Sequence, residues 1–352
     1  MFKLTGICCV AFALVAIQAA AAQRGIIGKD DRTMVPAKHR TLARGVGMIF
    51  DQRRSHVCTA FCVGVSVIAT NAHCIPYFRN KNRKELRKIN DFVFYLLKDG
   101  EVREQTYLQD NPVGDRFVPW MSVLYGRALD RSGRRSTTAW LTEQRHDWAL
   151  AKLARPVCLG RVISFADAAF LRKARNLRRA KVFTIGYHGD KLDGHSRYAP
   201  CRIRTVSGSG KRVTVNHTCD TVSGASGSPI FASTRQGPRV IALVVGHIRG
   251  RRWRRYPGGR QVTIARWRTN VGVLPLAFLD KLERFRVADF VPFDMSISRL
   301  QASLIASGYL RGKADNIFGP ATRAAIVRVE KKLGLVPLGI PTLSVISHLD
   351  ER

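Results

Sequence analysis

The sequence has few acidic residues, and this shortage is its most unusual compositional feature. Only 25 Asp and Glu stand against 59 Lys and Arg among 352 residues, a formal net charge of +34 at pH 7. Proline and glycine are not abundant, at 14 and 29 residues, and 45% of the chain is hydrophobic. This composition excludes a collagen-like or wholly disordered chain. The excess positive charge predicts anionic partners or surroundings, such as envelope polymers, membrane surfaces or nucleic acid.

Long apolar runs are missing after the N-terminus. No later window reaches the roughly 18 uncharged apolar residues needed to span a bilayer, so no transmembrane segment is expected in the mature chain. Residues 1–22 combine Lys3, an uncharged run from Leu4 to Ala16 and a small-residue end at Ala20 and Ala22. This pattern predicts a secretory signal peptide cut after Ala22. A membrane anchor is the alternative, but the run is short and no basic stop follows it.

Cysteine pairs with the C-x2-C spacing of zinc sites are also missing, so no metal site is expected. The signal peptide removes Cys8 and Cys9, and neither follows a lipobox of small residues. The cysteines that remain are Cys58, Cys62, Cys74, Cys158, Cys201 and Cys219. An even number in an exported chain predicts up to three disulfides, with the connectivity left open.

The mature chain begins with a segment over residues 23–45 and then changes pattern twice. Residues 46–280 hold short β-rich runs between Gly, Asn, Asp and Pro clusters, which predicts an all-β sandwich or barrel. Helices are expected there only in insertions, at Asn82–Lys88 and Ala168–Arg179. The runs are Phe92–Leu97, Lys181–Ile185, Arg212–Val215, Val240–Val245 and Gln261–Ala265.

The last part of the chain follows a helical pattern instead. Residues 281–295, with charged residues and Pro292, are expected to form a linker. Apolar residues then recur at helical spacing from Ile297 to Ile305 and from Thr322 to Leu333, and a third short run follows Pro341. Residues 296–350 are therefore expected to form a small domain of three helices.

Three short motifs in the β region carry the residues of a catalytic site. They are Ala69–Cys74 after an expected strand Val63–Ile68, His146–Leu150, and Gly224–Pro229. A serine hydroxyl needs a base within hydrogen-bond reach, and the base needs a group that fixes its tautomer. Each motif alone has a structural alternative: a histidine beside a strand, a turn aspartate or a loop serine. Together, in the order His73, Asp147, Ser226, they predict nucleophilic catalysis.

With these motifs, residues 27–280 resemble the chymotrypsin-like (trypsin-like) serine endopeptidases, most closely the bacterial branch that includes glutamyl endopeptidases. Gly28–Arg32 and Gly186–Lys191 are weaker matches to that branch, which usually has proline where this chain has His188. The resemblance implies a mainly β, two-barrel protease domain over residues 46–280. The active site would lie in the cleft between the barrels.

The same resemblance implies the role of each site residue. Ser226 would be the nucleophile, His73 the general base and then acid, and Asp147 the residue that orients His73. The backbone N–H groups of Gly224 and Ser226 would form the oxyanion hole. Peptide bonds would be cleaved through an acyl-enzyme without a metal or organic cofactor. Other aspartates between His73 and Ser226 do not open an apolar strand as Asp147 does; they are Asp91, Asp99, Asp110 and Asp115.

Two further expectations follow from the resemblance. The family's disulfide beside the catalytic histidine implies Cys58–Cys74. Cys201–Cys219 and Cys62–Cys158 are candidates for the other two pairs, whose connectivity stays open. Trypsin-type zymogens are activated when a new N-terminus pairs with an aspartate just before the nucleophile, where this chain has Ala225. Arg24–Gly28 looks like an activation site, so trimming after Arg24 stays open, but activation by that switch is not expected.

The preferred substrate residue stays open between two candidates. Asp220 lies six residues before Ser226, where trypsin-like enzymes select Arg or Lys, but Asp220-Thr221 also resembles glutamyl-type relatives. Those relatives bind glutamate through a histidine on the strand after the serine loop, for which His247 is the candidate. His247 is one residue out of register with the family's Gly-x-His pattern, and on a strand a shift of one residue points the side chain to the opposite face. Basic residues are slightly favoured over glutamate and other choices.

Residues 296–350 resemble the small helical peptidoglycan-binding domain of bacterial wall enzymes. The matches are Leu300–Leu304, Gly308–Leu310 and Asp315–Thr322, where Asn316 replaces the usual glycine; Asn tolerates the left-handed turn nearly as well. Peptidoglycan is therefore an expected partner. The alternative is a helical appendage that packs on the protease and binds no glycan.

Three basic clusters add a second kind of partner. They are Arg79–Lys88, Arg172–Lys181 and Arg249–Arg260, the last with Trp253 and Tyr256. Anionic envelope surface, solvent, and nucleic acid are all compatible with such clusters, but the signal peptide disfavours nucleic acid. We expect an exported, periplasmic or extracellular serine endopeptidase associated with the cell wall. The rival is a catalytically silent protease-like fold that binds wall or anionic polymer, against which the complete motifs argue.

Overall fold

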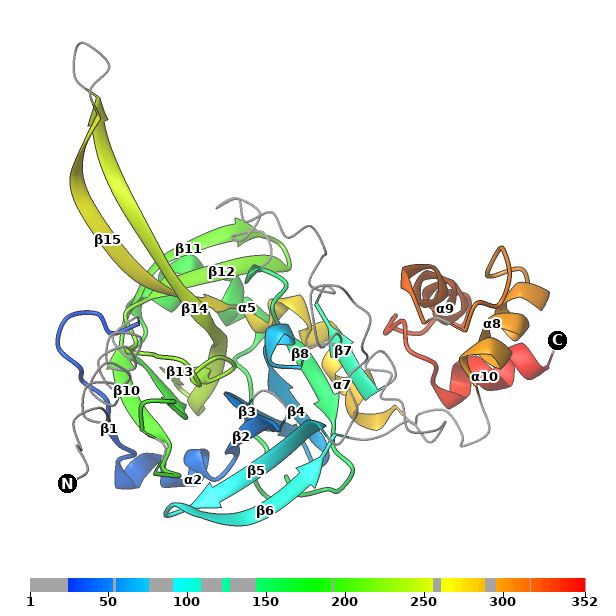
Figure 1. Ribbon diagram of the computed structural model, residues 1–352, viewed down its shortest axis with the longest axis horizontal. Coiled ribbons are helices and arrows are strands. Elements are labelled where there is room, and N and C mark those ends of the chain that lie inside the picture. The colour runs from blue at the N-terminus through cyan, green and yellow to red at the C-terminus, as the bar shows by residue number, and fades with distance from the viewer. Residues whose placement is uncertain are drawn as a thin grey trace, which may run out of the picture.

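The computed structural model describes residues 25–52, 55–75, 91–108, 122–126, 144–191, 193–255, 261–288, 296–316 and 318–351. Two antiparallel sheets form most of the molecule, and a group of three helices lies at one end (Figure 1). The two sheets correspond to the two expected barrels, and the mainly β fold with a C-terminal helical domain is confirmed.

The first sheet has seven strands in the order β6-β5-β2-β3-β4-β8-β7. Side chains such as Ile49, Ile68, Phe92 and Phe94 form its own buried cluster. Its strands are β2 (Val46–Asp51), β3 (His56–Gly64), β4 (Val67–Thr70), β5 (Phe92–Lys98), β6 (Glu101–Tyr107), β7 (Val123–Tyr125) and β8 (Ala149–Lys152).

The second sheet has eight strands in the order β1-β10-β9-β13-β14-β15-β12-β11. The ends of β14 and β15 extend together well beyond the rest of this sheet (Figure 1). Its strands are β1 (Thr33–Met34), β9 (Val182–Gly186), β10 (Arg197–Cys201), β11 (Ile203–Ser209), β12 (Arg212–His217), β13 (Pro229–Thr234), β14 (Gly237–Arg255) and β15 (Gln261–Val273).

A further apolar cluster joins the two sheets. It contains Phe61 and Leu150 from the first sheet, Phe183 and Phe231 from the second, and Phe278, which packs against Trp148 at 5.0 Å between ring centroids. Apolar burial of this extent is the main stabilising contribution to such an interface. It holds the ends of β4 and β8 against the loop before β13, where the catalytic motifs lie.

Two expected elements differ in detail. Val63–Ile68 is not one strand, because Val65 and Ser66 form a turn between β3 and β4. The expected helix Ala168–Arg179 is divided into α5 (Ala168–Arg172) and α6 (Ala174–Arg179), since Lys173 adopts an extended ψ of 99°. The insertion at Asn82–Lys88 lies outside the described residues. The short helices are η1 (Ala37–His39), α2 (Arg40–Ala43), η2 (Ala72–Cys74) and η4 (Pro275–Ala277).

The expected linker needs a correction at its start, because helix α7 (Leu279–Val287) occupies that stretch. Leu282 and Phe285 of α7 are buried in the cluster that joins the two sheets. Leu282 and Phe285 are spaced i, i+3 and so lie on one face of the helix. The charged residues between them made this apolar pair easy to miss in the sequence. Residues 281–287 therefore belong to the packed structure rather than to a free connection.

The helical domain consists of α8 (Ile297–Ala306), α9 (Pro320–Lys332) and α10 (Leu343–Asp350) around its own apolar cluster. Gln301 is buried, and its amide donates to Asp315 at 2.7 Å and to Thr322 at 3.0 Å. Its oxygen accepts from the N–H of Asn316 at 2.9 Å, and Asn316 has a left-handed φ of 56°. These motif residues therefore stabilise the turn before α9.

This domain also packs on the protease domain. Leu338 and Ile340 of the helical domain are buried in the same cluster as Leu282 and Phe285 of α7. Glu330 is 0% exposed and pairs with Arg284 of α7 at 2.8 Å. Burial raises the pKa of Glu330, whose carboxylate also accepts from the N–H groups of Leu338 and Gly339. A buried pair of this kind fixes geometry more than it adds stability.

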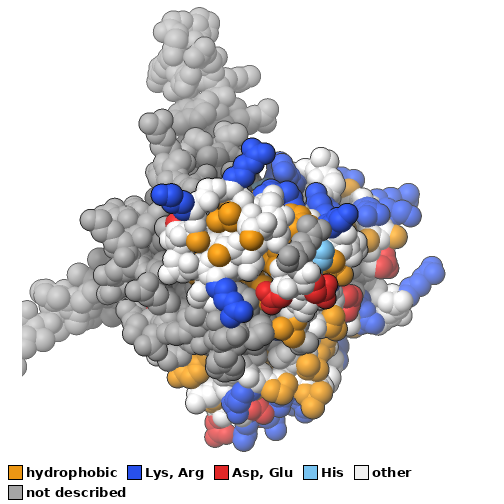
Figure 2. Space-filling view, turned by 90° about the vertical axis from the view of Figure 1, so that its right-hand side faces the viewer, with side chains coloured by type: hydrophobic (Ala, Val, Ile, Leu, Met, Phe, Trp, Pro, Cys, Tyr) orange, Lys and Arg blue, Asp and Glu red, His pale blue; other side chains and the backbone are white. Residues whose placement is uncertain are grey.

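The charge of the chain is visible on its surface. Lys and Arg side chains lie at several places on the described part of the face that carries the helical domain (Figure 2). Within the described residues, no helix combines the length and the apolar character needed to cross a membrane.

Candidate active site

The end of β4 brings the histidine motif to the aspartate motif. β4 pairs with β8 so that Thr70 lies opposite Ala149, and each motif adjoins its strand. The buried side chain of Asn71 donates to the Asp147 carbonyl at 2.7 Å, and the His73 N–H donates to Asp147 Oδ1 at 3.0 Å. The backbone of one motif therefore positions the carboxylate of the other.

The side chains of His73 and Asp147 are in direct contact. His73 Nδ1 lies 2.6 Å from Asp147 Oδ2, and the Asp147 side chain is only 8% exposed. Burial lowers the pKa of His73, but the charge and the hydrogen bond of Asp147 outweigh this effect and raise that pKa above its usual value. A carboxylate at Nδ1 favours the tautomer that leaves Nε2 as the proton acceptor.

The serine motif forms a tight turn between two strands. The N–H of Ala225 donates to Val222 O and that of Ser228 to Ala225 O, both at 3.0 Å. Gly224 and Gly227 have φ values of 95° and 84°, in the region that favours glycine. A Cβ on Gly227 would lie 2.1 Å from Thr59 O, so no larger residue fits.

Contacts from both sheets hold Ser226. Its carbonyl accepts from the N–H of Thr59 at 2.8 Å and lies 4.0 Å from Cys74 Sγ, beside His73. Its hydroxyl donates to Val245 O at 3.4 Å, a long bond that leaves it available. Within the described chain, the N–H groups of Gly224 and Ser226 meet no hydrogen-bond acceptor. Two free amides on such a turn can receive a developing oxyanion.

Three disulfides are present among the described residues. They join Cys58 to Cys74, Cys62 to Cys158, and Cys201 to Cys219. The first lies next to His73, and the His73 ring and both sulfurs lie within 4.8 Å of one another. The sulfurs bond to each other, so they do not offer the thiolates that metal ligation requires.

The candidate pocket residues lie in different environments. Asp220 is 1% exposed, and its two oxygens accept from the N–H groups of Ile27 at 2.7 Å and Asp31 at 3.0 Å. Thr221 is buried, and its N–H donates to Gly25 O at 3.1 Å. His247 is exposed on β14, opposite Asn270 of β15. Asp220 and His247 remain the two predicted determinants of substrate preference.

The rival aspartates have other positions. Asp91 precedes β5 and its carbonyl accepts from the N–H of Gln52 at 2.8 Å. Asp99 lies in the β5–β6 turn with a φ of 53°. Asp110 and Asp115 lie outside the described residues. Among the described aspartates, Asp147 contacts His73.

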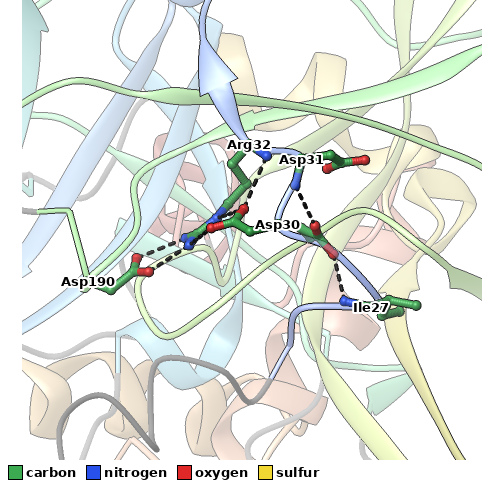
Figure 3. A network of polar contacts seen from close by, with 6 residues as sticks. Ile27, Asp30, Asp31, Arg32 and Asp190 are labelled. Carbon is green, nitrogen blue, oxygen red and sulfur yellow. Dashed lines mark hydrogen bonds and ion pairs between the residues drawn. The ribbon is translucent and has the colours of Figure 1, made fainter.

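Sequence reasoning missed one pair of residues beside this site. Arg32 donates to both carboxylate oxygens of Asp190, at 2.8 and 2.6 Å, and to Asp30 at 2.9 and 2.8 Å (Figure 3). Arg32 lowers the pKa of Asp30 to about 2. Arg32 and Asp190 both lie in motifs that match the bacterial branch, and their opposite charges were the only sequence signal of the contact.

His188, near Asp190, is buried. That burial lowers the pKa of His188 to about 3, so its ring is neutral.

The basic clusters are only partly described. Arg79–Lys88 and Tyr256–Arg260 lie outside the described residues. Arg172–Lys181 spans the end of α5 and all of α6, which contacts β11, and Leu177 and Ile203 belong to the same buried cluster. Six cations of this cluster are exposed, and none forms an ion pair with any other described residue. They are Arg172, Lys173, Arg175, Arg178, Arg179 and Lys181.

Family models match both the β region and the helical region of the chain. A family model described as "Trypsin-like peptidase domain" matches residues 58–243, and one described as "Putative peptidoglycan binding domain" matches residues 295–349. A solved Glu endopeptidase in complex with MPD is 17% identical with a TM-score of 0.47, covering 74% of this chain and 98% of that chain. A thermostable serine protease, AL20, from an extremophilic microorganism is 17% identical with a TM-score of 0.38, covering 66% and 92%. Comparison with curated proteins gave no match.

Proposed function

Because the chain belongs to the family of trypsin-like peptidase domains, we propose that it is an exported serine endopeptidase with the triad Ser226, His73 and Asp147. The observation that carries this proposal is the 2.6 Å contact between His73 Nδ1 and Asp147 Oδ2 beside the Ser226 turn. A histidine oriented in this way is the base that a serine nucleophile needs.

The mechanism follows from these positions. His73 Nε2 takes the proton of the Ser226 hydroxyl while Ser226 Oγ attacks the peptide carbonyl. The N–H groups of Gly224 and Ser226 donate to the resulting oxyanion. His73 then gives its proton to the leaving amine, and an acyl-enzyme forms on Ser226. Water activated by His73 hydrolyses this ester, and Asp147 stabilises the protonated ring at each step.

Cleavage of a peptide library by the protein comprising residues 23–352 tests the proposal, with the Ser226→Ala variant as the inactive control. The same assay identifies the residue that the enzyme prefers before the cleaved bond. Cleavage after Glu would support His247 as the pocket determinant, and cleavage after Arg or Lys would leave the role of Asp220 to be decided by its substitution. If the correctly disulfide-bonded protein cleaved nothing, the proposal would fail in favour of a silent wall-binding or anionic-polymer-binding fold, or an unprocessed precursor. Limited proteolysis followed by the same assay separates these two.

We also propose that the helical domain holds the enzyme at peptidoglycan. The chain with Ser226→Ala is expected to co-sediment with insoluble peptidoglycan and to be released by soluble glycan-peptide fragments. Because glycan recognition does not rest on charge, a bound fraction should remain at about 1 M salt, where screening acts within about 3 Å. Complete release by salt, with no competition by fragments, would assign the binding to charge alone and contradict this role.

The exposed cations of α5 and α6 support a second, weaker contact with anionic envelope surface. Arginine binds phosphate through two parallel hydrogen bonds, and four of the six exposed cations are arginines. In the co-sedimentation assay, the fraction of protein released from peptidoglycan as the salt concentration rises measures this charge-dependent contact. The envelope location rests on the expected signal peptide, and for the same reason nucleic acid is not proposed as a partner.

A further inference from the structure

The N-terminal segment 25–34 packs beside the serine motif, and we call it the N-terminal strap. It begins just after the expected signal-peptide cut and ends in β1, where Thr33 lies opposite Tyr198 of β10. The carbonyl of Gly25 accepts from the N–H of Thr221 at 3.1 Å and from Asn270 Nδ2 at 2.7 Å. A Cβ on Gly25 would lie 1.6 Å from Thr221 O, so this approach requires glycine.

The strap holds one side of the nucleophile turn through Asp220. Both carboxylate oxygens of this nearly fully buried residue accept backbone N–H groups of the strap, from Ile27 and Asp31 (Figure 3). A buried carboxylate requires such partners, because an unpaired charge away from water is costly. Burial and then the charge of Asp220 raise the pKa of Asp31 to about 6. The strap therefore supplies the bonds that Asp220 needs.

The strap holds the other side through Arg32. The Arg32 side chain is 2% exposed, and its guanidinium donates to both oxygens of Asp190. The neighbouring Gly189 donates its N–H to Ser223 O at 2.7 Å, and a Cβ on Gly224 would lie 2.9 Å from Gly189 N. The chain of contacts runs from Arg32 through Asp190 and Gly189 to the residues that precede Ser226.

We propose that the N-terminal strap positions the nucleophile turn, with Arg32 and Asp220 acting through that turn on Ser226. The inference rests on the proposed peptidase function. It assigns Asp220 to the strap rather than to the recognition of a basic substrate residue. Arg32 and Asp220 are positioning residues, since neither is required to touch the peptide.

Three variants of residues 23–352 test the proposal by different routes. Arg32→Met removes the contact with Asp190, Asp220→Asn removes one acceptor, and Gly25→Ala displaces the start of the strap by steric contact. Lys29→Met is the matched control, because Lys29 is exposed in the strap and has no described contact. Each variant is assayed for kcat and KM across the peptide library, for reaction with a serine-selective phosphonate, and for its melting temperature.

The expected result is a fall in kcat of about 10–100-fold for every cleaved peptide in the three variants, because small misplacements at a reacting centre cost rates of that order. The preference profile and KM should change little, phosphonate labelling should slow in parallel, and Lys29→Met should stay within about twofold of wild type. Should Arg32→Met fail to fold, Gly25→Ala and Asp220→Asn carry the test.

Several outcomes would overturn the proposal. In one, Asp220→Asn loses only cleavage after Arg or Lys, which would make Asp220 a pocket residue. In another, Arg32→Met keeps wild-type kcat. Loss of folding in all three variants, with Lys29→Met folded, would reduce the strap to a structural role. Wild type that neither cleaves peptides nor reacts with phosphonate would overturn the proposed function itself.

Discussion

Replacement of Ser226 by alanine is expected to lower kcat/KM by about 10⁴–10⁶-fold, the range seen when a serine nucleophile is removed. The proposed mechanism places the acyl group on this hydroxyl, so its removal takes away the nucleophile that His73 activates. The residual rate would come from the amides of Gly224 and Ser226, which remain on the backbone. Initial rates on one cleaved library peptide give the measurement.

Ser233→Ala is the matched control for this loss. Ser233 lies on β13 in the same sheet, and its side chain is exposed. It should keep wild-type kcat/KM, because exposed substitutions away from a site have small effects. Unchanged cleavage in Ser226→Ala would rule out the acyl-enzyme mechanism.

Replacement of Asp147 by asparagine is expected to lower kcat by about 10³–10⁴-fold. The amide has the size of the carboxylate, so the position of His73 is kept. Its N–H₂ group can nevertheless face Nδ1, which puts the proton on Nε2, where the base must be free. The charge that stabilises protonated His73 is lost as well.

The pH profile provides the second readout of this change. Asp147 raises the pKa of His73, and the base acts in its neutral form. Cleavage by the wild type is therefore lost as pH falls through this raised pKa, and in Asp147→Asn the acid limb should move to lower pH. Asp99→Asn, an exposed change in the β5–β6 turn, is the control and should alter neither rate nor profile. An acid limb that stays in place in Asp147→Asn would contradict the assigned contact.

The three motifs of the proposed triad could be located in the sequence because each is local. His73 and Cys74 follow a strand directly, Asp147 precedes one, and the two glycines around Ser226 stand where left-handed φ values occur. Helices α8, α9 and α10 were predictable for the same reason, since apolar spacing and flanking Pro and Gly residues define them.

Contacts between distant segments could not be predicted in this way. Arg32 and Asp190 are 158 residues apart, and their contact depends on how the first residues of the chain cross the second sheet. Asp220 could be placed before Ser226 from the sequence, but its partners Ile27 and Asp31 use backbone N–H groups, which leave no trace in residue type. The docking of the helical domain was hidden for a similar reason. The ion pair between buried Glu330 and Arg284 could be predicted only if α7 were first recognised as a helix.

Mass spectrometry of the chain after reaction with a serine-selective phosphonate tests the central claim most directly. If His73 and Asp147 activate Ser226, one adduct should form per molecule and map to the peptide that contains Ser226. The adduct should be absent in Ser226→Ala and greatly slowed in Asp147→Asn. A correctly disulfide-bonded chain that stays unlabelled before and after limited proteolysis, or is labelled on another serine, would contradict the account.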